Sequence, residues 1–326
     1  MPELDRVAEQ LGVPSASARE TTVRELVQLR FDAFGEVRSR GVTPDQVPTP
    51  SGNKIRLLDG IPTVSAEDLD AQAVVDGIGQ AGCLRVRSLF NPSQIESLKA
   101  GIDTAFAARE SKRVADPWHQ VFLPANCSDS QLSLIKVSRR ACSNPDYGAL
   151  LLADSPRMLQ NFVEISESSG LTNLVHRFLG ERPAISVNKA TLRVVSRDIA
   201  GGDWHQDGSF MGTPLQTLNS WIPLSDCGQT APGMDLVPLR LDGLVPTGEL
   251  GAWFPWSVSP REVRDAAQDT PIVRPVFEAG DILLFDELML HRTAATQGLS
   301  SDRYAIECWW FAPSGYPLET QVPLLV

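Results

Sequence analysis

The sequence predicts a mainly β fold, an antiparallel sandwich or barrel with flanking α-helices. From Pro183 onward, short segments of β-branched and apolar residues are separated by turn signals, and several short strands at this spacing are typical of such folds. Before Pro183, apolar residues follow helical spacing over much of the chain. The 326 residues are 42% hydrophobic. This is enough for one large core, because sandwiches and barrels can reach about 250 residues as one unit.

The first segment of the chain predicts a helical arm and a linker over residues 1–50. Val7 and Leu11 begin a series of apolar residues at helical spacing. The Pro-rich, polar run GVTPDQVPTPSGN then breaks that pattern. After the arm we expect a single domain over residues 51–326.

A strand and two helical regions follow the linker. The apolar run CLRVRSLF at 83–90 fits a strand, and NPSQ at 91–94 provides an N-cap, a first-turn proline and a capping box. These signals predict a helix over 92–109. A second helical region is expected over 155–179, ending at Gly180.

The segment 116–148, between the helical regions, shows no sustained period and predicts a long loop with short elements. Long loops often carry function. If this one is a lid, a polar or anionic substrate would meet His119, Lys136, Arg139 and Arg140. A solvated loop without a binding role is the simpler interpretation.

The second half predicts strands in AISVNKATLRVVS, TLNSWIPLS, PIVRPVF, DILLFD and RYAIECWWFA. Three aromatic residues, Trp253, Phe254 and Trp256, fall between two of these segments. They predict either a pocket wall or core packing, and core packing is the simpler interpretation.

The charge and the cysteines indicate where the protein works. A net charge of −11 repels phosphate backbones and anionic lipid surfaces, so we expect no nucleic acid and no membrane partner. No run approaches the roughly 20 apolar residues of a membrane span, and MPELDRVAEQ does not resemble a secretion signal. The five cysteines contain no CxxC pair, which predicts reduced thiols. We therefore expect a cytoplasmic protein.

Two of the four histidines lie in contexts that favour metal binding. In DWHQDGSF, His205 and Asp207 are two positions apart, and on an extended segment both side chains would project from one face. His291 follows a strongly apolar strand and a turn. Two imidazoles and one carboxylate on one face of a metal are the arrangement of non-haem iron(II) oxygenases. A structural His–Asp pair is the alternative for the first two residues.

Arg303 lies twelve positions after His291, at the start of the last predicted strand. A guanidinium group holds a carboxylate with two parallel hydrogen bonds, which lysine cannot do as rigidly. The sequence therefore predicts a co-substrate with a carboxylate. A surface salt bridge with Asp302 is the alternative.

Weaker candidates for contact with the co-substrate lie on the neighbouring predicted strands. Lys189, Thr191 and Arg193 alternate on the strand before the His-X-Asp segment, and Asn219 and Trp221 lie on the strand after it. Thr191 and Asn219 are the candidates we select. Packing or ladder roles are the alternative for both.

The order of these motifs resembles the phytanoyl-CoA dioxygenase family of Fe(II)- and 2-oxoglutarate-dependent oxygenases. The resemblance covers roughly 70–313 through CLRVRSLFNPSQIESLKAGID, WHQDGSF, NSWIPLSD, GDILLFD and LMLHRT. It implies a double-stranded β-helix, which is a cupin-like jelly roll, with buttressing helices. It also implies that His205, Asp207 and His291 bind Fe(II), and that Arg303 pairs with the distal carboxylate of 2-oxoglutarate.

The resemblance implies that O2 and 2-oxoglutarate are consumed, that succinate and CO2 are released, and that a C–H bond of a small-molecule substrate is hydroxylated. Asp207 argues against halogenation, because related halogenases have a small residue there. Ala305 stands where the family often has Ser or Thr, so one co-substrate hydrogen bond must come from elsewhere. Around Pro238 the chain reads VPLRL where relatives read PGSH, which predicts a rebuilt turn.

Two other functions remain as alternatives. A non-catalytic jelly roll that binds a metal or ligand would not need the complete set of candidate ligands. A zinc hydrolase would use the same three ligands to acidify water, but it gives Arg303 no role. The sequence leaves open the substrate, the oligomeric state, and the choice among hydroxylation, desaturation, epimerisation and cyclisation.

Overall fold

The computed structural model describes residues 16–41, 43–112, 116–143, 148–294 and 296–326, with the backbone alone over 16–22. Within these ranges the helices are α2 (Ala16–Arg40), α3 (Ala71–Ala81), α4 (Pro92–Ser111), α5 (Asp129–Cys142), α6 (Pro156–Ser168), α7 (Leu171–Leu179), α8 (Gly208–Met211) and α9 (Pro260–Ala267). The short 3₁₀ helices are η1 (Ala66–Asp68), η3 (Leu152–Asp154) and η4 (Pro313–Gly315). The helical spacing at Val7 and Leu11 lies outside the described residues.

The described strands are β1 (Leu57–Leu58), β2 (Ile61–Ser65), β3 (Cys83–Arg87), β4 (Ala149–Leu151), β5 (Ala184–Ser186), β6 (Thr191–Val195), β7 (Thr217–Pro223), β8 (Gly233–Leu236), β9 (Ile282–Phe285), β10 (His291–Ala294), β11 (Arg303–Phe311) and β12 (Pro323–Leu325). The large sheet has the order β1-β2-β3-β9-β7-β11-β5-β12, with β6 pairing to β11 and β4 to β6. A smaller sheet pairs β8 with β10. Isolated bridges from His205 to His291 and from Leu236 to Val273 widen it.

Strand β11 shows how the large sheet separates two apolar cores. Its side chains alternate between the faces, as strand geometry requires. One core, shared with the helices, contains Ile306, Cys308 and Trp310. The other, shared with the small sheet, contains Ala305, Trp309 and Phe311. The result is the predicted sandwich, with one outer face covered by helices.

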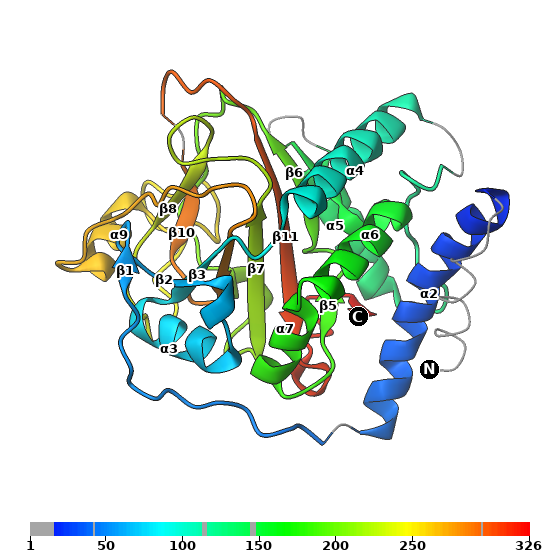
Figure 1. Ribbon diagram of the computed structural model, residues 1–326, viewed down its shortest axis with the longest axis horizontal. Helices are drawn as coiled ribbons and strands as arrows, with labels where there is room; N and C mark the ends of the chain where they lie inside the picture. The colour runs from blue at the N-terminus through cyan, green and yellow to red at the C-terminus, as the bar shows by residue number, and fades with distance from the viewer. Residues whose placement is uncertain (1–15, 42, 113–115, 144–147, 295) are drawn as a thin grey trace.

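Figure 1 shows α4, α6 and α7 over one side of the large sheet, and β8, β10 and α9 on the opposite side. The capping box predicted before α4 is present, because the Asn91 side chain accepts from the Gln94 N–H and the Gln94 side chain accepts from the Asn91 N–H. Helix α2 packs on β12, where the Arg30 guanidinium donates to the Leu325 carbonyl. The proposed boundary near residue 50 stays a prediction. No helix in the described ranges is long and apolar enough to cross a membrane.

The structure corrects several expected elements. The segment 116–148 contains the 14-residue helix α5, where a loop with short elements was expected. AISVNKATLRVVS forms two strands, β5 and β6, with a turn between them, and PIVRPVF contributes only the bridges at Val273 and Phe277. Strands β2 and β3 pair in parallel, so the sheet is not antiparallel throughout.

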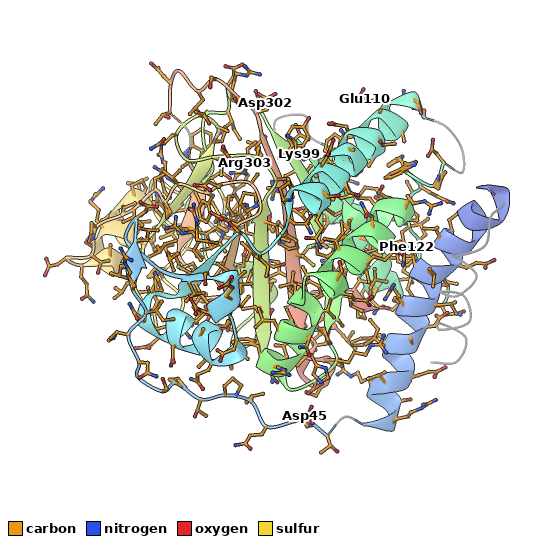
Figure 2. All side chains as sticks on the ribbon, in the orientation of Figure 1. Asp45, Lys99, Glu110, Phe122, Asp302 and Arg303 are labelled. Carbon is orange, nitrogen blue, oxygen red and sulfur yellow. The ribbon has the colours of Figure 1, made fainter. Side chains whose placement is uncertain are left out.

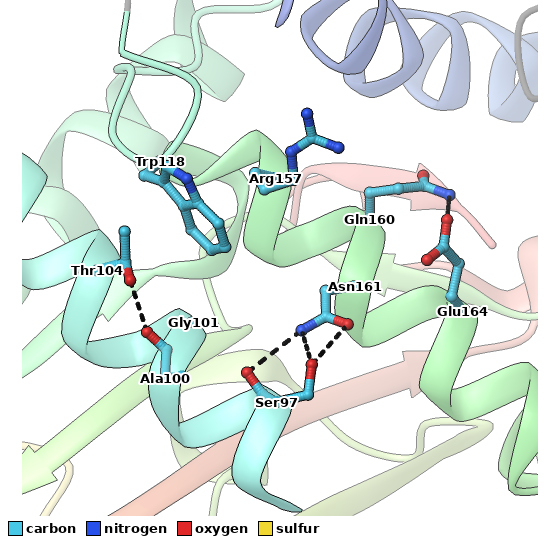
Figure 3. A pocket seen from close by; sticks show the side chains of 9 residues that line it. All are labelled: Ser97, Ala100, Gly101, Thr104, Trp118, Arg157, Gln160, Asn161 and Glu164. Carbon is cyan, nitrogen blue, oxygen red and sulfur yellow. Dashed lines mark hydrogen bonds between the residues drawn. The ribbon is translucent and has the colours of Figure 1, made fainter. Parts of the chain in front are cut away.

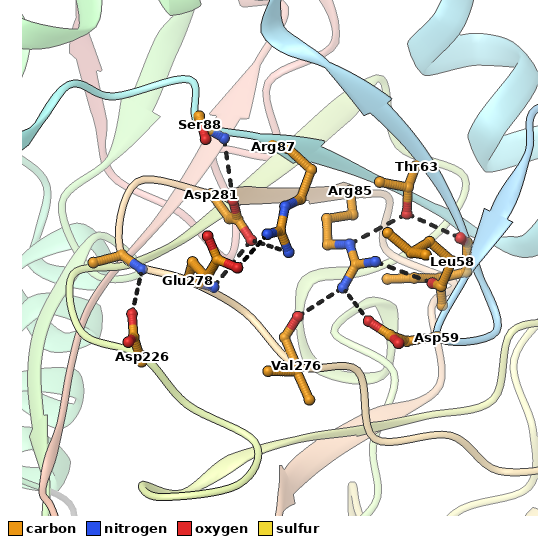
Figure 4. A network of polar contacts seen from close by, with 12 residues as sticks. Leu58, Asp59, Thr63, Arg85, Arg87, Ser88, Asp226, Val276, Glu278 and Asp281 are labelled. Carbon is orange, nitrogen blue, oxygen red and sulfur yellow. Dashed lines mark hydrogen bonds and ion pairs between the residues drawn. The ribbon is translucent and has the colours of Figure 1, made fainter.

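Arginine side chains on β3 fix one edge of the large sheet (Figure 4). Arg85 is fully buried, and its guanidinium donates to the Val276 carbonyl at 2.7 Å and to Asp59 at 2.9 Å. Arg87 pairs with Glu278 at 2.6 Å and with Asp281 at 3.3 Å. These contacts join β3 to the turn before β9, and β9 leads toward His291. We assign the network a structural role, because its charged groups already have partners.

A polar groove of about 520 Å³ lies between α4 and α6 (Figure 3). Its polar groups pair with one another, since Asn161 donates to the Ser97 hydroxyl and Gln160 donates to Glu164. The groove is lined by Ser97, Ala100, Gly101, Thr104, Trp118, Arg157, Gln160, Asn161 and Glu164. None of the predicted metal ligands is among these residues.

Trp310 provides a test of the core on the helical side. Its ring is fully buried, and the indole N–H donates to the Ser220 hydroxyl at 2.8 Å. We expect Trp310→Ala to lower the free energy of unfolding by about 3–5 kcal/mol, because it leaves a large cavity. The control Trp253→Ala removes the side chain of a residue that is 83% exposed. It should change the free energy of unfolding by less than about 0.5 kcal/mol. Urea unfolding followed by circular dichroism measures both, and equal losses would contradict the assignment.

Candidate metal and co-substrate site

Backbone pairing at the edge of the small sheet brings the two candidate histidines together. The His205 N–H donates to the His291 carbonyl at 3.0 Å, and the His291 N–H donates to the His205 carbonyl at 3.0 Å. The imidazole centroids are 4.4 Å apart. His291 begins β10, so the apolar strand and turn before it position it as predicted.

Asp207 reaches the same point by a route that differs from the prediction. It adopts helical backbone angles, φ −66° and ψ −25°, at the start of α8, so the expected extended alternation from His205 is wrong. Its carboxylate nevertheless lies 3.7 Å from His205 Nε2 and 4.0 Å from His291 Nε2. One ligand atom from each residue lies within 4.8 Å of the others.

The protonation of the two rings suits this cluster to a cation. His205 Nδ1 lies 2.8 Å from the Asp203 carbonyl, and His291 Nδ1 lies 2.9 Å from the Met289 carbonyl. Because a carbonyl only accepts hydrogen bonds, each Nδ1 carries the proton, and in a neutral ring Nε2 has a free lone pair. Two lone pairs and a carboxylate thus face one another without a donor between them. A divalent metal satisfies all three, and the carbonyl partners orient the rings as in known metal sites.

Burial controls the charges in the cluster. Burial, together with the neighbouring His291, holds the pKa of His205 well below its ordinary value. Burial also raises the pKa of Asp207 to about 6. The Asp207 Oδ2 atom is buried without a hydrogen-bond partner. A metal ion would remove the cost of that unpaired buried oxygen.

Arg303 lies in the space between the sheets, at the start of β11. It is 2% exposed, and the alternative of a salt bridge with Asp302 is wrong, because Asp302 pairs with Arg197 at 3.0 Å. Figure 2 shows Arg303 and Asp302 at the same end of the chain's longest strand. The Arg303 guanidinium donates to the Gly233 carbonyl at 2.9 Å and lies over the Trp221 ring.

The buried Arg303 guanidinium has an unmet hydrogen-bonding demand. Its Nε atom has no hydrogen-bond partner in the part of the chain that the structure describes, and burial lowers the pKa of Arg303 to about 10. It therefore stays protonated at neutral pH. A ligand carboxylate would supply the missing acceptor and the counter-charge.

Strand register places Thr191 and Asn219 on the same face as Arg303. Thr191 is opposite Glu307, and Asn219 is opposite Trp309, both at odd positions of β11 like Arg303. Among the described residues, four buried groups lack a hydrogen-bond partner: the Thr191 hydroxyl, both amide atoms of Asn219 and the indole N–H of Trp309. Such orphaned groups are rare in native interiors and mark a missing ligand or water.

The sequence did not single out Trp309 as a site residue. The signal was present, since Trp309 is six residues after Arg303 on one strand and so shares its face.

Two of the basic residues that the sequence singled out, Arg139 and Arg193, are held in ion pairs. Arg139 forms an ion pair with Asp154 at 2.6 Å, so it is not available to hold a substrate anion. Arg193 pairs with Glu307 at 3.1 Å between β6 and β11.

Comparison with family models matches residues 78–303 to the phytanoyl-CoA dioxygenase family. The match covers more than half of the chain and includes all four principal site residues. The chain therefore belongs to the phytanoyl-CoA dioxygenase family, whose oxygenases depend on Fe(II), 2-oxoglutarate and O2. The resemblance stated from the motifs is confirmed.

Comparison with solved structures gives one likeness that bears on the fold. EctD from S. alaskensis, crystallised with 2-oxoglutarate and 5-hydroxyectoine, matches with a TM-score of 0.53 and 14% identity over 84% of each chain. The carbocyclase SnoK from nogalamycin biosynthesis gives a TM-score of 0.49 and 17% identity over 81% of this chain and 99% of its own. The likeness to EctD, at this identity, shows the jelly-roll fold alone. Comparison with curated protein sequences gives no match.

Proposed function

We propose that this oxygenase hydroxylates an unactivated C–H bond of a small metabolite or natural-product intermediate, releasing succinate and CO2. The observation that carries the proposal is that the protein interior holds both a set of candidate metal ligands and a buried cation. Three candidate metal-ligand atoms face one another without a donor, and a buried arginine on the same side of the large sheet has no ion pair within the described residues. The zinc hydrolase alternative accounts for the candidate metal ligands and gives the buried arginine no role.

The proposal assigns roles residue by residue. His205, Asp207 and His291 would hold Fe(II), and Arg303 would hold the distal carboxylate of 2-oxoglutarate. Bound iron with 2-oxoglutarate and O2 supplies the oxidising chemistry. The protein would fix the ligand geometry, pair the co-substrate's charge and exclude water from the buried space between the sheets.

Thr191 is our proposed answer to the missing Ser or Thr at Ala305. Ala305 faces the interior and offers no polar atom, whereas the Thr191 hydroxyl faces the same space without a partner. Asn219 would provide a further amide contact. We also propose a cytoplasmic location, which the absence of a disulfide among the five cysteines supports.

Anaerobic titration with Fe(II) and then 2-oxoglutarate tests the proposal. The expected result is a weak visible charge-transfer band that saturates with 2-oxoglutarate, because chelation of iron by the 2-oxo acid produces it. Succinate release in the presence of O2 would follow. If iron binds and no band forms, the co-substrate assignment fails and the zinc hydrolase takes its place. If no metal binds, the non-catalytic protein takes its place.

Asn219→Leu should separate stability from function. The Asn219 amide is fully buried with both polar atoms unpaired, and an unsatisfied buried polar group costs about 1–3 kcal/mol. We expect the leucine variant without ligands to unfold at a higher temperature. Its affinity for 2-oxoglutarate should fall roughly tenfold, which is the loss of one good hydrogen bond.

Asn188→Leu is the matched control. The buried Asn188 amide donates to the Thr320 carbonyl at 3.1 Å and accepts from the Val322 N–H at 2.9 Å. Its replacement should therefore destabilise the ligand-free protein by about 1–3 kcal/mol. Calorimetry and the charge-transfer titration measure both variants. An Asn219→Leu protein that is less stable and binds 2-oxoglutarate normally would show that Asn219 is only a packing residue.

A further inference from the structure

A continuous series of aromatic rings leads from the metal ligand His205 to the surface. The Trp256 ring lies edge-on to His205 with centroids 5.6 Å apart, and Phe254 stacks on Trp256 at 5.0 Å with an interplanar angle of 4°. Phe210 lies 5.8 Å from Trp256 and 6.2 Å from His205. These three rings, Phe210, Phe254 and Trp256, form what we call the aromatic wall.

The outer end of the aromatic wall is exposed, so the expectation of core packing for this segment is wrong. Phe254 is 39% exposed and the adjacent Trp253 is 83% exposed. Leu244 and Leu250, on the same loop region, are exposed as well. Exposed apolar side chains gathered beside a site commonly mark a binding surface.

The loop that carries Phe254 and Trp256 is fastened to the candidate metal site. Asp203 accepts from the Ser257 hydroxyl at 2.7 Å and from the Trp253 N–H at 3.3 Å. The carbonyl of the same Asp203 accepts from His205 Nδ1. Trp256 is therefore held in a defined position relative to the metal ligand, as a binding wall requires.

A cation that forms no ion pair within the described residues lies at the inner end of the wall. The Lys189 ammonium group lies 3.7 Å from the Phe210 ring centroid. Within the described residues it has no hydrogen bond and no ion pair, in contrast to Arg193, which pairs with Glu307. A positive group beside an aromatic surface is complementary to a flat, apolar molecule that carries an anion.

Lys189 is placed away from the carboxylate end of the co-substrate. Arg303 pairs in register with Val195, at the far end of β6. Lys189 is six residues earlier in the chain, in the turn between β5 and β6. Asp207 is the carboxylate that acts most on the pKa of Lys189. Lys189 therefore lies toward the metal end of the site, beside the aromatic wall, and Arg303 is left to hold the distal carboxylate.

We propose that the aromatic wall and Lys189 bind a planar, apolar molecule with an anionic group, and that this molecule is the substrate. The assignment as substrate rests on the proposed function, whereas the binding site itself does not. The planar body would stack on the exposed Phe254 at the outer end of the aromatic wall, and the anion would pair with Lys189. The wall adjoins His205, so a bound molecule would lie next to the metal.

Two fluorescent probes test the site in the metal-free protein. 1-Anilinonaphthalene-8-sulfonate is planar and anionic, and N-phenyl-1-naphthylamine has the same rings without the sulfonate. We expect Lys189→Met to lower the affinity for the sulfonate probe roughly tenfold, because a charge-assisted contact is lost. The affinity for the neutral probe should not change. Phe254→Ala should lower the affinity for both probes roughly fivefold, because a stacking contact is lost. Val137→Ala, at an exposed apolar position of α5, should change neither.

Three results of the probe experiments would overturn the proposal. They are equal effects of Lys189→Met on both probes, no effect of Phe254→Ala, or an effect of Val137→Ala as large as that of Phe254→Ala. A weakened 2-oxoglutarate band in Lys189→Met would instead assign this lysine to the co-substrate and also refute the proposal. If the wild type shows no band while the probes behave as expected, the proposed function fails, its substrate assignment fails with it, and the binding site stands.

Discussion

Replacing His291 by alanine is expected to abolish iron binding and 2-oxoglutarate turnover. The His291 Nε2 atom is one of three acceptors that face the metal position, and its ring is held by the Met289 carbonyl and by Phe285 at 5.0 Å. Loss of partners outside the ligand set already costs 10–100-fold in metal affinity in known sites, so loss of a ligand should cost more than about 100-fold. Anaerobic Fe(II) titration and succinate release measure the two losses.

His176→Ala is the matched control. His176 lies on α7, half exposed, with Asp45 at 3.5 Å as its ion-pair partner. Its removal should leave the iron affinity and the rate of turnover within about twofold of the wild-type values, as expected for a surface substitution. Added imidazole should partly restore iron binding in His291→Ala and should do nothing for His176→Ala. Full iron affinity in His291→Ala would refute the metal assignment.

The sandwich was predictable because its signals are local. The nearly continuous apolar run in RYAIECWWFA predicts a strand that is buried on both faces, and successive side chains of β11 enter the two cores in turn. The same alternation puts Arg303 on the inner face, which explains why a single charged residue at a strand start could be recognised. The capping box before α4 is equally local.

The sequence did not reveal features that depend on tertiary contacts. Helix α5 has a capping box at Ser128 and Gln131, but Ile135 is its only fully buried residue among those described. A helix that buries so little shows a weak period, so it was predicted as loop. The helical turn at Asp207 is another such feature, because a two-residue spacing looks the same on a strand and at a helix start.

The surface position of the aromatic wall could not be predicted for a related reason. Composition does not tell an exposed Trp253 from a buried Trp310, and only the contacts of Asp203 fix the loop. Likewise, Lys189 and Arg193 look equivalent on the predicted strand. The structure separates them, because only Arg193 has a carboxylate partner among the described residues.

Arg303→Met is expected to lose co-substrate affinity while keeping the metal. The buried guanidinium is placed to bind a carboxylate, and removing one member of a buried charge pair costs about 2–5 kcal/mol. The Kd for 2-oxoglutarate should therefore rise at least roughly 30-fold. Fe(II) affinity should stay close to wild type, since Arg303 offers no atom to the metal. The charge-transfer titration and the Fe(II) titration measure these two quantities separately.

A co-substrate analogue shows whether the loss comes from the distal carboxylate. 2-Oxopentanoate keeps the chelating 2-oxo acid and lacks that carboxylate, so wild type should bind it much more weakly than 2-oxoglutarate, whereas Arg303→Met should bind both equally. Arg303→Lys keeps the charge but cannot donate two parallel hydrogen bonds. Its preference for 2-oxoglutarate over 2-oxopentanoate should lie between that of wild type and that of Arg303→Met. Arg197→Met, which breaks the exposed pair with Asp302, should stay within about twofold of wild type. A retained preference for 2-oxoglutarate in Arg303→Met would mean that another residue binds the distal carboxylate.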